Sequence, residues 1–283
     1  MGKIVTWRRF CLPLVYDRPS PMSIQKFPLA TVNKIRRYIQ DVLALTDSEQ
    51  QSQLWAELGE TEEPPEPESL DDLSGLFTFG GLAPEELSEL DGSWLISTVN
   101  PAATLLKLSG LRLKPELRWV SYLYRNQQEG RGLVFAVPES LSTISQLEKS
   151  LVKSQDISQP PQPEGALGHF MEALEGDRSP GSFLLASLLH RELQEFGALG
   201  KRCNWSHHRL IETPPPQVKW RWETEQPKDF SAKVKVLPDG QAATEFFTCR
   251  VQNPIALYRH LDQFPVGHYK PNSLDKAIAL AYR

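Results

Sequence analysis

Residues 117–153 have the sequence LRWVSYLYRNQQEGRGLVFAVPESLSTISQLEKSLVK. The first nine residues are rich in β-formers, and GLVFAV at 132–137 is a second apolar run of strand length. The six residues between the two runs suit a hairpin loop. The spacing of apolar residues then becomes helical. This stripe consists of Leu141, Ile144, Leu147 and Leu151. The stretch therefore predicts two antiparallel strands followed by a helix.

Strands and helices alternate irregularly on both sides of this unit. Before it, Val32, Ile35, Ile39 and Val42 recur at helical spacing and predict a helix from about residue 31. Lys34, Arg36 and Arg37 are expected on its solvated side. The other predicted elements are a second helix at 47–58, a short helix after Pro84, a helix after Asn100–Pro101, helices at 167–175, 182–197, 254–264 and 274–282, and strands at 218–225, 231–237 and 244–251.

This order lacks the regular βαβ alternation of a doubly wound sheet. The sequence therefore predicts an α+β fold of mixed antiparallel strands and helices, with two lobes joined by Pro-rich connectors. The expected segments are an N-terminal helical region at 1–58, an acidic Pro-rich linker at 59–75, an α+β lobe with the hairpin at 76–153, a Pro/Gln-rich connector at 154–166, and a lobe of helices and sheet at 167–283.

Composition places the chain among ordinary globular proteins. Hydrophobic residues make up 40% and charged residues 23% of the sequence. The three cysteines, Cys11, Cys203 and Cys249, are widely spaced and suggest no disulfide framework, which indicates a reducing compartment. No apolar run approaches 18 residues, and the N-terminus lacks a signal-peptide pattern, so we expect a cytoplasmic protein without a transmembrane segment.

The formal net charge of −4 conceals an uneven distribution. Residues 1–37 have a net charge of +7, residues 38–106 contain 15 acidic and no basic residues, and residues 107–283 have a net charge of +4. The densest acidic part, at 59–72, has three prolines and no aromatic residue, which is typical of a solvated tether. It could also lie over a basic surface of the same chain or dock a basic partner.

The strongest candidate for a binding surface is KRCNWSHHRLIETPPPQVKWRW at 201–222. Cationic side chains bind phosphates and aromatic faces stack on bases, so this mixture suits single-stranded nucleic acid. It equally suits an anionic ligand or an acidic protein segment. The alternative is structural, with Trp205 in the core and residues 219–222 as the two faces of one strand. The candidate binding residues are Arg202, Trp205, His207, His208, Arg209, Lys219, Trp220, Arg221 and Trp222.

Motifs for catalysis or cofactor binding are missing from the sequence. Cys203, His207 and His208 offer three zinc-type donors, but no second cluster supplies a fourth, so we expect no metal. No G-x-S-x-G, Walker A or G-x-G-x-x-G pattern occurs, so no cofactor and no catalytic residue are predicted.

Two stretches resemble segments of uncharacterised cyanobacterial proteins. They are FLLASLLHRELQEFGALGKRCNWSHHRLI at 183–211 and LYRHLDQFPVGHYK at 257–270. The resemblance implies a cyanobacterial, cytoplasmic setting and brings no known activity or ligand.

Three functional hypotheses follow from the sequence. The leading one is a non-enzymatic interaction, assembly or regulatory protein whose basic, aromatic surface binds a protein partner and is modulated by the acidic segment. The second is a protein that binds single-stranded nucleic acid. The third is an enzyme whose site assembles from distant residues. A concave pocket that joins His207 or His208 to a carboxylate would favour the third. The oligomeric state is not predicted.

Overall fold

The computed structural model describes residues 23–46, 49, 92–126, 128–152, 154 and 156–282. The predicted elements before residue 23, the helix at 47–58, the acidic linker and the helix after Pro84 lie outside these residues, apart from Glu49.

The larger sheet is antiparallel, with strands in the order β1-β9-β10-β11-β12-β8. Strand β7 pairs with the end of β10 that β9 leaves free, so β7, β10, β11 and β12 are successive neighbours across one part of the sheet. The bounds are β1 (Ser23–Phe27), β7 (His208–Ile211), β8 (Lys219–Trp222), β9 (Ala232–Val236), β10 (Ala242–Arg250), β11 (Ala256–Phe264) and β12 (Asn272–Tyr282).

The predicted hairpin at 117–137 is present in a second antiparallel sheet, with the order β2-β4-β5. Its loop is shorter than expected because Gly130 and Arg131 already pair with β4. The predicted helix that follows is divided into a short 3₁₀ turn, η2, and α5. The bounds are β2 (Ser93–Ile96), β4 (Leu117–Arg125), β5 (Gly130–Pro138), η2 (Glu139–Leu141) and α5 (Ile144–Leu151). Smaller elements are the pair β3 (Leu111–Leu113) and β6 (Leu174–Gly176), with 3₁₀ turns η1 (Pro101–Leu106) and η3 (Phe170–Ala173).

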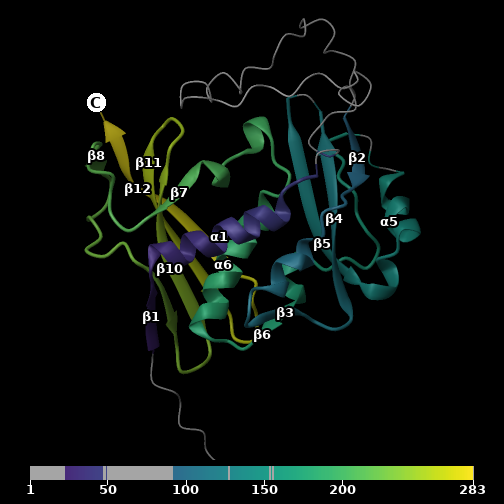
Figure 1. Cartoon of the computed structure of the whole chain (residues 1–283), viewed down its shortest axis with the longest axis horizontal. Helices are drawn as coiled ribbons and strands as arrows, with labels where there is room; N and C mark the ends of the chain where they lie inside the picture. Colours follow the sequence, from purple (N-terminus) through teal and green to yellow (C-terminus); the bar gives the residue numbers. More distant parts are fainter. Residues whose placement is uncertain are drawn as a thin grey trace, which may run out of the picture.

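Two 15-residue helices, α1 (Leu29–Leu43) and α6 (Pro180–Gln194), join the sheets. Both lie between the two sheets, and α6 contacts β9 and β10 of the larger sheet as well as β5 of the smaller one (Figure 1). Ser179 caps α6: its hydroxyl accepts a hydrogen bond from the backbone N–H of Ser182 at 3.2 Å. One apolar core includes Trp119 and Val134 of the smaller sheet and Phe246 of the larger one. The α+β prediction is confirmed.

Three predicted helices are strands or mostly other structure. Residues 254–264 and 274–282 fall in β11 and β12, and residues 167–175 contain only a 3₁₀ turn before β6. Arg36 is also not on the solvated side of α1, since it is 5% exposed. Within 156–166 no helix or strand occurs among the described residues, which agrees with an irregular connector, although Pro161 and Pro163 are buried. No helix in the described ranges has the length and apolar character needed to cross a bilayer.

Candidate functional site

Four polar side chains form a hydrogen-bonded row across the inner face of the larger sheet. They come from the four neighbouring strands β7, β10, β11 and β12. His208 Nδ1 is 2.7 Å from the Thr248 hydroxyl, which is 2.8 Å from His260 Nε2. His260 Nδ1 is 2.8 Å from Asp275 Oδ1, and these two residues are direct partners in the β11–β12 register. Because side chains alternate between the faces of a sheet, this register puts all four on the same face.

The hydrogen-bonding capacity of each group assigns the protons in this row. Ionised Asp275 only accepts, so His260 donates from Nδ1–H and its Nε2 carries a lone pair. Thr248 therefore donates its single hydroxyl proton to His260 and accepts from Nδ1–H of His208. Neutral His208 is left with a lone pair on Nε2. Among the described residues, no hydrogen bond engages that atom.

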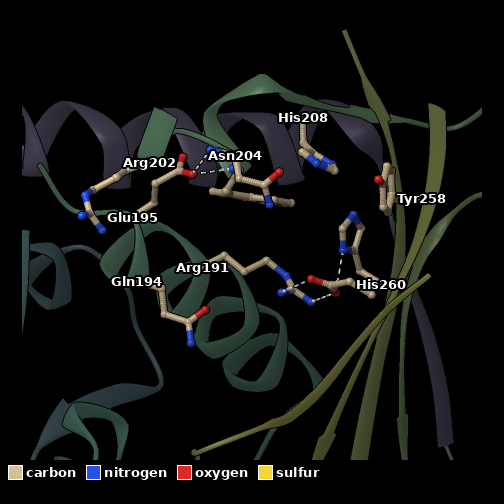
Figure 2. A pocket seen from close by; sticks show the side chains of 10 residues that line it. Arg191, Gln194, Glu195, Arg202, Asn204, His208, Tyr258 and His260 are labelled. Carbon is tan, nitrogen blue, oxygen red and sulfur yellow. Dashed lines mark hydrogen bonds and ion pairs between the residues drawn. The ribbon is translucent and has the colours of Figure 1, made fainter. Parts of the chain in front are cut away.

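The row ends at a pocket of about 210 Å³ that is lined by His208, His260 and Asp275 (Figure 2). His208, Tyr258 and His260 lie on one side of this pocket, and Glu195 and Arg202 lie on the other. Thr248 is fully buried, so it connects the two histidines and is inaccessible as a nucleophile. We call this cavity the His208 pocket. Its full lining is Arg191, Gln194, Glu195, Arg202, Asn204, Trp205, His208, Tyr258, His260 and Asp275.

Burial keeps both histidines neutral. It lowers the pKa of His208 to about 3, with His260, Arg250 and Arg36 adding to the effect. Burial also lowers the pKa of His260, against the hydrogen bond that His260 donates to Asp275, which favours the charged imidazole. For Asp275, burial alone would raise the pKa, but the bond to His260 and the charge of Arg191 lower it overall. At neutral pH the row therefore holds one carboxylate and two neutral imidazoles.

Arg191 of α6 fixes the carboxylate end of the row. Its guanidinium lies 2.9 Å from Asp275 Oδ1 and 2.8 Å from Asp262 Oδ1, and it is 4% exposed. Asp262 is fully buried and also accepts a hydrogen bond from the Ser187 hydroxyl. A buried carboxylate needs such partners, because an unpaired charge in the interior is costly. Helix α6 thus holds Asp275 in position to accept from His260.

The segment before β7, which carries Trp205 and His208, is held by two charged groups. Glu195, just after α6, accepts backbone N–H bonds from Asn204, Trp205 and Ser206 at the start of the 3₁₀ turn η5 (Trp205–His207). Arg36 of α1 donates to the backbone oxygens of Trp205 and His208. Arg36 is buried, and Glu195 accepts three hydrogen bonds. The position of His208 is therefore fixed by the packing of α1 and α6 on the sheet.

The structure separates the residues that the sequence placed in one binding surface. Arg202, Trp205 and His208 line the His208 pocket. His207 is half-buried outside it, and the exposed Arg209 donates to the backbone oxygen of Ser206. The remaining four lie on β8. This strand pairs with β12, so β10, β11 and β12 separate it from β7. These residues are Lys219, Trp220, Arg221 and Trp222.

Trp220 and Trp222 pack against a second apolar cluster that contains Phe247 and Leu257. Phe247 adjoins Thr248 in the strand and so faces away from the row. Lys219 and Arg221 are exposed. The alternation therefore fits the structural alternative for this strand, while binding by these residues stays a prediction.

Sequence reasoning missed most of the row. Thr248, His260, Asp275 and Tyr258 were not singled out, and Arg191 was treated only as part of a helix. The one available indication was LYRHLDQF at 257–264, where Tyr258, His260 and Asp262 alternate with Leu257, Arg259 and Leu261. That alternation has the period of a strand, with a polar buried face.

Within the described residues, no group of three His, Cys, Asp or Glu side chains has an arrangement that could hold a metal ion. Cys203 is half-buried and does not join the two adjacent histidines at a common centre. No known protein family, curated protein or solved structure matches this chain. The site must therefore be interpreted from its own geometry.

Proposed function

We propose that this protein is an enzyme in which His208 acts as a general base on a small polar substrate. The observation that carries the proposal is the connection of a pocket-facing imidazole to a half-exposed carboxylate through Thr248 and His260. A buried cluster of perturbed titratable groups beside a pocket identifies a candidate active site. This is the third of the hypotheses drawn from the sequence, the enzyme assembled from distant residues.

The reaction class follows from the lone pair on His208 Nε2. Nε2 takes a proton from water or from a substrate hydroxyl as that oxygen attacks an electrophilic centre, and the proton later returns to the leaving group. An imidazole with a pKa of about 3 is a weak base by itself. The row gives the proton a second position, because it can pass through Thr248 and His260 to Asp275 and leave both imidazoles uncharged, but Asp275, whose pKa is itself lowered, is also a weak base. Hydrolysis or group transfer is thus the activity that the site supports best.

The test uses a panel of esters, amides, phosphomonoesters and phosphodiesters with purified protein. We expect turnover of one class, and a 10²–10⁴-fold lower kcat in His208→Asn, the usual contribution of a general base. The matched control is His207→Asn, because His207 is the adjacent histidine but does not line the pocket. Circular dichroism and melting curves of both variants confirm that they are folded.

Equal activity of His208→Asn and wild type contradicts the proposal, and so does the absence of turnover across the panel. The competing hypothesis is the interaction protein, in a cytoplasmic setting, with a protein partner or single-stranded nucleic acid. It is supported by the exposed cations of β8, Lys219 and Arg221. In the described part of the chain, β8 lies at one edge of the larger sheet. This hypothesis predicts no turnover, together with a pull-down partner that survives nuclease treatment if it is a protein and is lost on nuclease treatment if it is single-stranded nucleic acid.

A further inference from the structure

A second hollow adjoins the His208 pocket, and three of its eight lining residues are cationic. It has a volume of about 370 Å³ and shares Gln194, Glu195 and Arg202 with that pocket. The other lining residues are Arg131, Gly132, Phe196, Ala198 and Lys201. We call it the Arg131 hollow. It lies where β5 of the smaller sheet meets the segment after α6, which is the kind of seam where ligand sites form.

The side chains that line the Arg131 hollow carry a net positive charge. No ion pair in the described part of the chain engages Arg131 or Lys201. Arg202 is 3.3 Å from Glu129, and both side chains are about one third exposed. The carboxylate of Glu195 accepts three backbone N–H bonds and keeps its negative charge, so it offsets one of the three positive charges in the lining. Burial and the nearby charge of Arg202 both lower the pKa of Arg131, which shows that the two guanidiniums repel each other.

The backbone that carries these cations is fixed by contacts between the hairpin and the segment after α6. The residues on both sides of Arg131 are tied to the segment after α6: Gly130 N–H donates to Leu199 at 3.4 Å and Gly132 N–H donates to Phe196 at 2.8 Å. Lys201 and Arg202 follow Gly200 in the 3₁₀ turn η4 (Gly200–Arg202). Gly200 has φ +65°, and a Cβ there would lie 2.2 Å from the backbone oxygen of Gln128, so the turn closes tightly on the hairpin. Such preorganisation lowers the cost of binding.

We propose that Arg131, Lys201 and Arg202 bind a phosphate group of the substrate, whose reactive part lies in the His208 pocket. This inference rests on the proposed function and adds the substrate class, a small phosphorylated molecule. Guanidinium groups match the geometry of phosphate oxygens, and lysine adds a point charge. A polymer is disfavoured, because a single-stranded nucleic acid needs a basic track with stacking aromatics, and Trp220 and Trp222 lie on the opposite face of the sheet.

The test is an NMR titration of the full chain with inorganic phosphate and with phenyl phosphate, at constant ionic strength. We expect saturable shifts of the amides around 130–132 and 200–202, and at least a tenfold weaker Kd in Arg131→Gln. Lys219→Gln is the matched control, because Lys219 is exposed on β8 far from the hollow, and it should bind like wild type. His208→Asn should also keep phosphate binding, since the anion contacts lie outside the imidazole row.

The outcomes separate this inference from the proposed function. No saturable shift, or equal weakening in Arg131→Gln and Lys219→Gln, overturns the phosphate site whatever the activity shows. If the protein binds phosphate but His208→Asn turns over substrate as fast as wild type, the phosphate site stands and the role of His208 as general base is overturned. A single-stranded hexanucleotide that binds more than tenfold tighter than phenyl phosphate overturns the assignment to a small molecule. If turnover of a phosphoester is found, Arg131→Gln should raise KM more than it lowers kcat.

Discussion

At the scale of single residues, three histidines make the protein sensitive to acid. His190, His208 and His260 are each at most 3% exposed, and burial is the main cause that lowers the pKa of all three. In the unfolded chain each would titrate near pH 6.5. Below that pH the unfolded state therefore binds more protons than the folded state, and stability is lost as the pH falls. For His208, the pH range over which this stability is lost runs from about pH 6.5 down to about pH 3.

His208→Asn tests this sensitivity. The asparagine amide N–H can replace Nδ1–H as the donor to Thr248, but it does not titrate. The groups that act on His208 are His260, Arg250, Arg36 and Asp275, and all are retained. We expect the free energy of unfolding of wild type to fall between pH 6 and pH 4, and the slope to be shallower in the variant by about 1.4 kcal/mol per pH unit. Urea denaturation at several pH values measures both slopes, and identical slopes would show that His208 titrates normally.

At the scale of elements, a buried arginine of α1 joins this helix to α6 and to the segment before β7. Arg36 Nε is 2.7 Å from Glu192 of α6, and Nη2 is 3.0 Å from the backbone oxygen of Trp205. Arg36→Met would leave Glu192 buried without its cation, so we expect a loss of about 3–5 kcal/mol in the free energy of unfolding. Arg37→Met removes the same charge from an exposed neighbour and should change stability by less than about 0.5 kcal/mol. If urea denaturation shows the two variants to be alike, Arg36 is not the anchor of α1.

The same residue shows why α1 was predicted only in outline. Val32 and Ile39 are buried as the helical spacing indicated, but spacing cannot show that a charged side chain is buried when its partners are about 160 positions away. The hairpin of β4 and β5 and the start of α6 could be predicted because their patterns are local: β-formers around a loop, and a Ser-Pro cap. The core of the candidate site has no local pattern, since its residues are brought together by strand pairing.

Strand β11 was mistaken for a helix for a related reason. An ordinary strand shows apolar residues on its buried face, whereas the buried face of β11 contains His260 and Asp262. The helix was predicted instead from Asn253 and Pro254, a pair typical of the cap and first residue of a helix. Because polar residues of the row occupy the buried face of β11, the stretch lacks the alternation of buried apolar residues by which a strand is usually predicted. Local rules are expected to fail at functional sites in this way.

At the scale of the whole molecule, the two sheets share one core and both proposed ligand regions lie near their junction. The shared core contains Trp119 of β4, Leu188 of α6 and Phe246 of β10. The backbone bond from Gly132 to Phe196 joins β5 to the segment after α6 and forms a wall of the Arg131 hollow. A change at this contact should therefore weaken both sheets and the phosphate site together.

Gly132→Ala tests this coupling. A Cβ at Gly132 would lie 2.3 Å from Phe196 Cδ1 and 2.4 Å from the backbone oxygen of Phe196, so the contact must open. We expect a loss of about 1–3 kcal/mol, as for other overpacked sites. Gly181→Ala is the control, because its Cβ would meet nothing closer than 3.7 Å and alanine favours a helix. Hydrogen exchange measures where protection is lost. If the chain folds as one unit, amides of β4 and of β10 lose protection equally in Gly132→Ala. Loss of protection confined to β4 and β5 would mean that the smaller sheet opens alone. The junction would then not be part of a single cooperative core.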